Sequence, residues 1–160
     1  MTLRITVVCT GNICRSPMGD VIINHAITQA GLDHLVSVDS CGTGGWHVGE
    51  KADRRAITEL AKAGYDGSAH RAAQLCDDHA SADLIIAMDR GHEQALLRYG
   101  IPATKIRLLR SFDPLATSDD VEDPYYGYAS DFEVTRVHIE AALPGIMEWI
   151  TTALNLKERG

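Results

Sequence analysis

The sequence lacks a basic excess, a long apolar run and any regular cysteine pattern. Lys and Arg number 15 against 22 Asp and Glu, which gives a formal net charge of -7. Nucleic-acid-binding surfaces depend on clustered basic residues, so we expect no nucleic-acid partner. No apolar stretch is long enough to span a bilayer, so we expect no membrane insertion either.

Cysteine is sparse and irregularly placed. The four cysteines, at positions 9, 14, 41 and 76, form neither a CxxC pair nor a spacing typical of zinc ligands. We therefore expect no metal site. The first nine residues read as a strand rather than as a signal peptide. A reducing, cytoplasmic location is expected, and export without a signal peptide is the alternative.

Segments of strand and helix character alternate along the 160 residues, a length typical of one domain. Apolar runs predict strands over about residues 3–9, 36–39, 82–88 and 106–109. Helical spacing predicts helices from Ser16 to a stop at Gly31, over 53–63, over 90–99 and from 134 onward, with Pro144 kinking or splitting the last one. Residues 113–130 are expected to form a loop, and 65–76 give no clear prediction.

This alternation predicts an α/β fold: a single domain over residues 1–160, with a four-stranded, mainly parallel sheet and helices on both faces. In such sheets the loops that follow the strands lie at one edge, where ligands bind. We expect three segments to meet there: the loop after Cys9, a loop containing Ser40, and the loop after the fourth strand.

The most specific chemical signal is the run CTGNICRS from Cys9 to Ser16. A buried strand precedes it and a helical pattern follows it. Backbone N–H groups of such a loop can turn inward around a tetrahedral oxyanion, and the helix N-terminus adds partial positive charge. Arg15 can bind two phosphate oxygens with its planar guanidinium. This field favours a thiolate at Cys9, so the run predicts a phosphate-binding loop with a nucleophile at its base.

Neighbouring residues fit that loop. Gly11 and Asn12 tolerate the positive φ that a tight anion-binding turn demands. Ser16 is a good N-cap and Pro17 suits the first helical position. A strand–turn–helix junction with an inert buried cysteine is the alternative interpretation.

A second motif, DPYYG over 123–127, lies in the acidic loop. Pro124 restricts Asp123 to an extended conformation. A carboxylic acid beside aromatic rings and other carboxylates keeps its proton to higher pH and can protonate a departing oxygen. Tyr125 and Tyr126 suit the wall of an aromatic slot. A solvated acidic loop with ordinary tyrosines is the alternative.

Together, the runs over 7–18 and 123–127 resemble the low-molecular-weight protein tyrosine phosphatases, most of all the actinobacterial members. The resemblance extends over essentially the whole chain. Further matches in family order and spacing are Ser40 with Gly42 and Thr43, Trp46–Gly49, His70–Ala72, and Met88 with Asp89.

The resemblance implies hydrolysis of protein phosphotyrosine and small aryl phosphates without a cofactor or metal. By this analogy Cys9 forms a phosphocysteine intermediate, Arg15 binds the phosphoryl group, and Asp123 acts as general acid and then base. The implied partners are phosphotyrosine-containing proteins and a cognate tyrosine kinase, with inorganic phosphate as product. The implied phosphate-binding residues are Thr10, Gly11, Asn12, Ile13, Cys14, Arg15 and Ser16.

The resemblance also implies a supporting shell. Asn12 is expected in a left-handed conformation, fixed by hydrogen bonds from Ser16, Ser40 and His70. Ser16 either binds the Cys9 sulfur or only caps the helix, and Asp89 either serves the site or only caps the following helix. His70 is expected to be buried and structural in either case.

Substrate choice is assigned by the resemblance to a cleft lined by Trp46, His47, Tyr125 and Tyr126. A cleft deep enough for a phosphotyrosine ring leaves the shorter phosphoserine short of the cradle.

The other cysteines are assigned less specifically. Cys14 either forms a reversible disulfide with Cys9 or fills space as a buried thiol. Cys41 is read as packing, and Cys76 has no assigned role.

Two rival functions are weighed. An arsenate reductase on the same scaffold needs two further cysteines downstream to pass a disulfide outward, and only Cys76 stands there. A non-catalytic phosphotyrosine-binding module would keep Arg15 but lose Cys9 or Asp123, and the sequence has both. Catalysis is therefore the favoured reading.

Overall fold

The computed structural model describes residues 2–159. Four parallel strands form one sheet in the order β2-β1-β3-β4. Their bounds are β1 Leu3–Cys9, β2 Val36–Gly42, β3 Leu84–Ala87 and β4 Ile106–Leu108. The expected four-stranded parallel sheet is confirmed, and every neighbouring pair is parallel.

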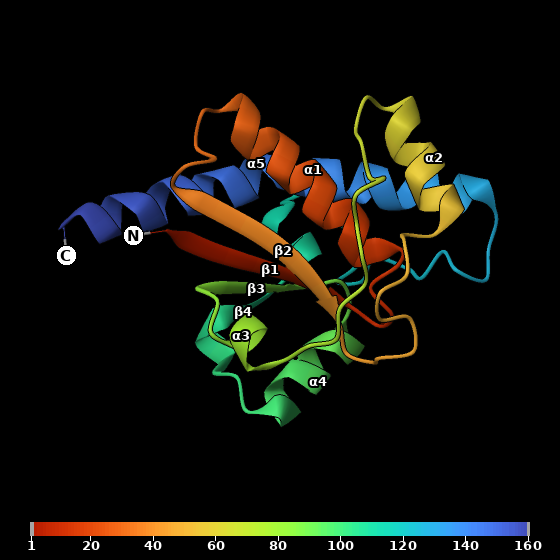
Figure 1. Cartoon of the computed structure of the whole chain (residues 1–160). Helices are drawn as coiled ribbons and strands as arrows, with labels where there is room; N and C mark the ends of the chain where they lie inside the picture. The colour runs from red at the N-terminus through yellow and green to blue at the C-terminus, as the bar shows by residue number, and fades with distance from the viewer. Residues whose placement is uncertain (1, 160) are drawn as a thin grey trace.

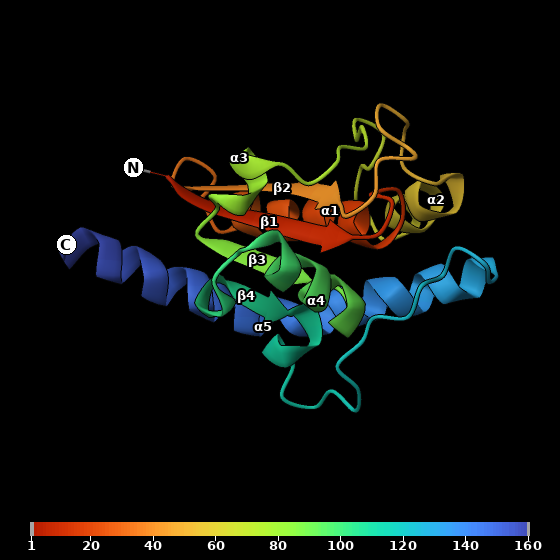
Figure 2. The same cartoon turned by 90° about the horizontal axis from the view of Figure 1, so that it is seen from below.

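Helices cover both faces of this sheet. They are α1 Arg15–Gln29, α2 Arg54–Lys62, α3 Asp77–Ala80, α4 Arg90–Tyr99 and α5 Ala129–Arg159, with short 3-10 helices η1 Ala103–Lys105 and η2 Leu109–Phe112. Figure 1 shows α1, α2 and α5 above the sheet and α3 and α4 below it. Figure 2, seen from below, shows α5 running the whole length of the molecule. The central strand β3 is buried and apolar throughout, as expected of a strand that is covered on both faces.

The two faces have separate apolar cores because side chains alternate along a strand. Leu3, Ile5 and Val7 of β1 pack into the larger core with α1 and α5. Val8 points the other way, into a smaller core that includes Leu96 of α4. The sheet is thereby fixed from both sides, which holds its carboxyl edge in place.

Helix ends follow the local sequence in most cases. Gly31, Gly64 and Gly100 all have positive φ where α1, α2 and α4 end, a conformation that side chains resist. Asp53 caps α2 by accepting a hydrogen bond from the backbone N–H of Arg55. These boundaries agree with the predicted stops.

Three local predictions are wrong, and one short helix was missed. Ser16 is not an N-cap, because α1 already begins at Arg15 after Cys14. Ser40 is not in a loop: β2 continues to Gly42, pairing with β1 along its full length. The last helix starts at Ala129, before the expected 134, and continues unsplit through Pro144 because Ile139, Ala142 and Ile146 bury one side of it in the core. The four-residue α3 was not predicted.

Among residues 2–159, no helix combines the length and apolar character needed to cross a bilayer.

Candidate active site

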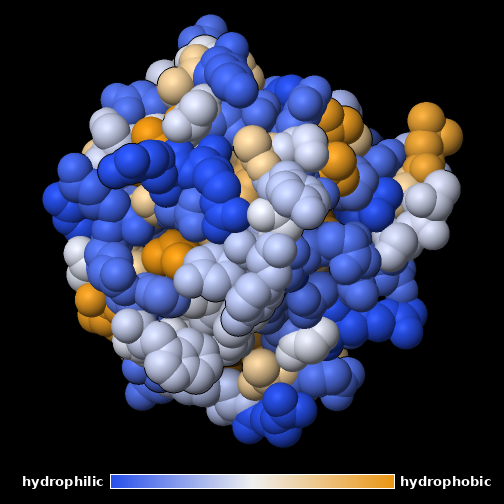
Figure 3. All heavy atoms as spheres, turned by 90° about the vertical axis from the view of Figure 1, so that its right-hand side faces the viewer, coloured by the Kyte–Doolittle hydropathy of each residue, from blue (hydrophilic) through white to orange (hydrophobic). Residues whose placement is uncertain are grey.

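The carboxyl ends of β1 and β2 and the loop after β4 enclose a cleft of about 370 Å³. Figure 3 views this end of the molecule, where a band of weakly polar side chains crosses a largely hydrophilic face. The cleft brings the two sequence motifs together, although they are more than a hundred residues apart. Its lining residues are Cys9, Thr10, Gly11, Ile13, Cys14, Arg15, Trp46, His47, Asp123, Tyr125 and Tyr126.

Cys9 lies at the base of the cleft, at the last position of β1. Its side chain is almost fully buried, and its Sγ is 2.9 Å from the hydroxyl Oγ of Ser16 on the first turn of α1. A hydroxyl at this distance can donate a hydrogen bond to a thiolate. Of the two readings of Ser16, the structure therefore supports contact with the sulfur and not the N-cap.

Asn12 holds the loop in shape. It is fully buried and has a φ of 58°, the left-handed conformation expected from its position. Its Nδ2 donates to Ser16 Oγ (2.8 Å) and to Ser40 Oγ (3.0 Å). Its Oδ1 accepts from the backbone N–H of Ala73 (2.9 Å), and its backbone carbonyl oxygen lies 2.7 Å from His70 Nε2.

The polar partners of Asn12 are themselves fixed. Ser40 Oγ donates to Asp20 Oδ2 on α1 (3.0 Å). Burial raises the pKa of Asp20 to about 6, even though Ser40 and Asn24 donate hydrogen bonds to its carboxylate. Burial also lowers the pKa of His70, so this imidazole is neutral at pH 7. The expected shell of Ser16, Ser40 and His70 therefore surrounds Asn12.

Arg15 is buried, and two acceptors hold one end of its guanidinium group. Nη1 donates to Asp89 Oδ2 (2.8 Å) and to the backbone carbonyl of Val121 (2.9 Å). Burial opposes ionisation of Asp89, but the backbone N–H of His92, the His92 ring and Arg15 together hold the pKa of Asp89 below its usual value. Asp89 also caps α4 through His92 N, so the structure shows the cap together with the contact to Arg15, and a role of Asp89 in the site stays a prediction.

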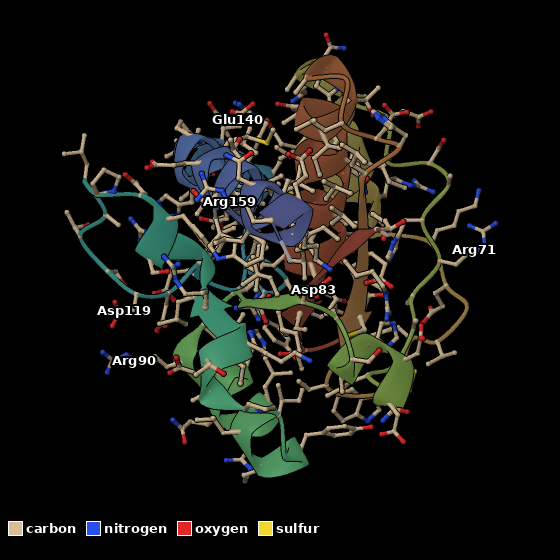
Figure 4. The ribbon with its side chains drawn as sticks, turned by 90° about the vertical axis from the view of Figure 1, so that its left-hand side faces the viewer. Arg71, Asp83, Arg90, Asp119, Glu140 and Arg159 are labelled. Carbon is tan, nitrogen blue, oxygen red and sulfur yellow. The ribbon has the colours of Figure 1, made fainter. Side chains whose placement is uncertain are left out.

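Asp123 lies across the cleft from the phosphate loop, with its Oδ2 3.6 Å from Arg15 Nη2. The segment before it is anchored to the sheet, because Val121 N donates to the backbone carbonyl of Met88 (2.8 Å). Arg90 at the start of α4 forms an ion pair with Asp119, and the two side chains face one another in Figure 4. The segment of Val121 and Asp123 is thus held beside the cleft, while the side chains of Asp119 and Glu122 stay exposed to solvent.

Aromatic side chains form the upper walls. Trp46 and Tyr126 are 76% and 90% exposed, and the rings of Tyr125 and Tyr126 pack edge-to-face with centroids 4.9 Å apart. His47 Nδ1 is 2.6 Å from Glu50 Oε2, which orients its ring beside Gly11. The walls can therefore accept a flat apolar group above an anion.

The remaining cysteines are free thiols, and Cys14 and Cys41 are buried. Burial is the main cause that raises the pKa of the Cys14 thiol far above its usual range, with Asp53 adding to it. Burial likewise raises the pKa of Cys41 to about 12. Both groups are protonated at neutral pH, and a disulfide between Cys9 and Cys14 stays a prediction.

Known proteins resemble this chain in both sequence and fold. The sequence model of the family "low molecular weight phosphotyrosine protein phosphatase" matches residues 4–158. The chain belongs to this family. It is 49% identical over 154 residues to low molecular weight protein-tyrosine phosphatase A of Mycobacterium tuberculosis, covering 95% of this chain and 94% of that protein.

Solved structures of this phosphatase family have the same fold. A protein tyrosine phosphatase from Entamoeba histolytica, crystallised with Hepes in its active site, superposes with a TM-score of 0.90 at 27% identity over 95% of this chain and 99% of its own. The Drosophila arginine phosphatase superposes with a TM-score of 0.85 at 26% identity over 92% and 98%. The family and the fold class expected from the sequence are confirmed.

Two residues of the phosphatase site were not predicted from the sequence. His92 on α4 is buried, its Nε2 is 2.9 Å from Thr10 Oγ1, and its Nδ1 is 3.1 Å from Asp89 Oδ1 without hydrogen-bonding alignment. Burial and the nearby Arg15 lower the pKa of His92 to about 4. Arg55 on α2 contacts the segment that follows Asp123. Thr10 is 82 residues from His92, and Tyr125 and Gly127 are 70 and 72 residues from Arg55, so no local pattern reveals these contacts.

Proposed function

We propose that this protein hydrolyses phosphotyrosine in proteins, and small aryl phosphates, through a phosphocysteine intermediate on Cys9. The observation that carries the proposal is the convergence of Cys9, Arg15 and Asp123 in one cleft with aromatic walls. The family membership supports the same class of reaction.

Binding uses groups that are already in position. The loop of residues 10–15 would surround the phosphoryl oxygens with backbone N–H groups, and Arg15 would add a guanidinium edge. Because Asp89 and the Val121 carbonyl hold Arg15 Nη1, little reorganisation is needed when charge develops on the phosphoryl group. Preorganised donors of this kind contribute mostly to the transition state.

In the first step the Cys9 thiolate attacks phosphorus. The S–P bond forms while the bond from phosphorus to the aryl oxygen breaks, and Asp123 transfers its proton to that oxygen. A tyrosyl oxygen has a parent pKa of about 10 and leaves poorly as an anion, so this proton is typically worth roughly 10²–10⁴-fold. The products are the phosphocysteine and a neutral phenol.

In the second step Asp123, now a carboxylate, takes a proton from a water molecule that attacks phosphorus. The new O–P bond forms as the S–P bond breaks, which releases inorganic phosphate and restores the Cys9 thiolate. Ser16 Oγ, 2.9 Å from the sulfur, stabilises that thiolate as it leaves by donating a hydrogen bond. The cycle balances without a cofactor.

The walls favour an aryl substrate. Trp46, Tyr125 and Tyr126 offer ring faces and edges above the cradle, which suit a tyrosine ring and leave a phosphoserine side chain too short to span the cleft. A phosphoarginine substrate would offer no aromatic ring to pack between these walls. Turnover of phosphotyrosine and phosphoarginine peptides by the same preparation separates the two substrate classes, and we expect phosphotyrosine to be preferred.

The rival functions predict different losses. A reductase would pass a disulfide to further cysteines, but Cys76 is the one cysteine downstream of Cys41, and it is exposed with His79 as its sulfur's neighbour. A non-catalytic binding module would show no turnover of p-nitrophenyl phosphate even in wild type. Arsenate-dependent oxidation of thioredoxin would favour the reductase.

Turnover of p-nitrophenyl phosphate by wild type, Cys9→Ser and Asp123→Asn tests the proposal. We expect near-complete loss for Cys9→Ser and a partial loss for Asp123→Asn. Cys76→Ser serves as the control for a cysteine outside the cleft and should keep wild-type turnover. Equal activity in wild type and Cys9→Ser would rule out the phosphatase mechanism.

We infer phosphotyrosine-containing proteins as partners and the cytoplasm as the place of action. A substrate-trapping pull-down with Asp123→Ala would identify the phosphoproteins and any cognate tyrosine kinase among them. Capture that inorganic phosphate or vanadate fails to compete would argue against binding through the cleft.

A further inference from the structure

We propose that Arg55 is a positioning residue that holds the general acid Asp123 at its working distance from the phosphate loop. The inference rests on the proposed function, because it assigns a residue to the acid step of that reaction. Arg55 lies on α2, outside both sequence motifs, and it does not line the cleft.

Arg55 grips the backbone of the segment after Asp123. Its Nη2 donates to the carbonyl oxygen of Tyr125 (2.9 Å) and its Nη1 to that of Gly127 (3.2 Å). The guanidinium carbon also lies 5.8 Å from the centre of the Tyr125 ring and 4.6 Å from that of Phe132 at the start of α5. One side chain therefore fixes the backbone and one ring of the tyrosine wall.

The same guanidinium is anchored toward the phosphate loop. Arg55 Nε and Nη2 donate to the two carboxylate oxygens of Asp53 (3.0 and 2.9 Å), a bidentate pair. The backbone N–H of Asp53 donates to the carbonyl oxygen of Ile13 in the phosphate loop (2.7 Å). Burial opposes ionisation of Asp53, but its hydrogen bonds from Arg55 hold the pKa of this carboxyl below its usual value.

The contact reaches Asp123 through one residue, Tyr125. Arg55 holds the carbonyl oxygen of Tyr125, and the N–H of the same residue donates to Asp123 Oδ1 (3.1 Å). On the other side of Asp123, Val121 is tied to Met88 and to Arg15. Asp123 thus sits between two anchors, and Arg55 supplies the one that follows it.

Without Arg55, the segment after Asp123 keeps mainly local hydrogen bonds. Gly127 N donates to the carbonyl of Pro124, and Tyr128 N donates to Asp131 Oδ2. Neither bond ties the segment to the phosphate loop. Without Arg55, Asp123 should therefore move away from the departing oxygen. A small misplacement of a catalytic group lowers the rate strongly.

Four variants test this assignment: Arg55→Ala, Arg55→Lys, Asp123→Asn and the double variant Arg55→Ala/Asp123→Asn. The readout is kcat/KM for phenyl phosphate, a poor leaving group, and for p-nitrophenyl phosphate, a good one. This constant reports the reaction up to phosphoryl transfer to Cys9, the step in which the acid acts. Arg54→Ala is the matched control, because Arg54 is the exposed neighbour on the same helix and carries the same charge.

We expect Arg55→Ala to lower kcat/KM for phenyl phosphate by roughly 10- to 100-fold and to have a much smaller effect with p-nitrophenyl phosphate. Arg55→Lys should show the same pattern, since a single ammonium cannot reproduce the fork. In the Asp123→Asn background the Arg55 change should cost little more. Inhibition by inorganic phosphate should stay at the wild-type level, because the cradle is intact.

Three results would overturn the inference: equal losses with both substrates, an undiminished loss in the Asp123→Asn background, or the same pattern in Arg54→Ala. Arg55→Lys keeps the charge and carries the test if Arg55→Ala does not fold. If wild type turns over neither substrate, the proposed function itself fails. If wild type and Asp123→Asn show the leaving-group effect and Arg55 variants do not, only the positioning role is wrong.

Discussion

Replacing Asn12 by Ala should destabilise the fold more than any change of similar size on the surface. The side chain is fully buried and makes three hydrogen bonds, to Ser16, Ser40 and the backbone N–H of Ala73. Loss of its oxygen leaves the Ala73 N–H without that acceptor, at about 1–3 kcal/mol, and loss of its two donated bonds costs about 1 kcal/mol each. Alanine at a φ of 58° adds about 1 kcal/mol.

These contributions total roughly 4–6 kcal/mol, a large share of the stability of an ordinary domain. Urea unfolding followed by far-ultraviolet circular dichroism measures the loss. Asn12→Gly separates the two causes, because it removes the same hydrogen bonds but adopts the left-handed conformation freely, and it should be about 1 kcal/mol more stable than Asn12→Ala.

Asn155→Ala, the same chemical change at an exposed position of α5, is the control and should change stability by less than about 0.5 kcal/mol. A loss below about 1 kcal/mol in Asn12→Ala would refute the reasoning, since the network would then carry no measurable energy. Equal stability of the Ala and Gly variants would refute the backbone part alone.

Three further predictions concern buried titratable groups and one glycine. Burial raises the pKa of Asp20 from 3.8 to about 6, so its contribution to the free energy of unfolding is complete below pH 3.8 and is lost as the pH rises through 6. In wild type this loss should lower the urea-unfolding free energy by about 2–3 kcal/mol, and Asp20→Asn should abolish the decline. The pKa of His92 is lowered from 6.5 to about 4, so its contribution to the free energy of unfolding is present above pH 6.5 and is lost as the pH falls through 4. His92→Gln should remove about 3 kcal/mol of that acid sensitivity, and a wild-type slope in either variant would contradict the assignment. A Cβ on Gly42 would lie 2.6 Å from the Thr10 carbonyl oxygen and 3.1 Å from Asn12 N, so Gly42→Ala should lower kcat/KM at least tenfold by displacing the phosphate loop, and wild-type kinetics would show that the loop yields freely.

Local sequence was enough to predict the strand, loop and helix around Cys9. The signals there depend only on neighbours in the chain. They are an apolar run, a Gly and an Asn where the chain turns tightly, and an Arg near the start of the helix. The role of Ser16 as the N-cap was predicted wrongly because α1 begins at Arg15, two residues earlier than that role requires. In this geometry the Ser16 hydroxyl contacts Cys9 and Asn12 instead of a free helix amide.

Long-range contacts could not be predicted in the same way. Ser40 lies in β2 because pairing with β1 extends the strand beyond its apolar part, and such pairing depends on the partner strand. Arg55 contacts the Tyr125 carbonyl, and His92 contacts Thr10. These pairs come together only when the sheet has formed. Charged or polar residues with no local periodicity give no sign of such partners in a single sequence.

The central claim is that Cys9 carries the phosphoryl group during turnover. Rapid acid quenching during turnover of p-nitrophenyl phosphate, followed by peptide mapping by mass spectrometry, tests it directly. We predict one phosphoryl group per molecule on the peptide containing Cys9, formed together with a burst of one equivalent of nitrophenol. Turnover with an unmodified Cys9 peptide, or a phosphoryl group on another residue, would contradict the account.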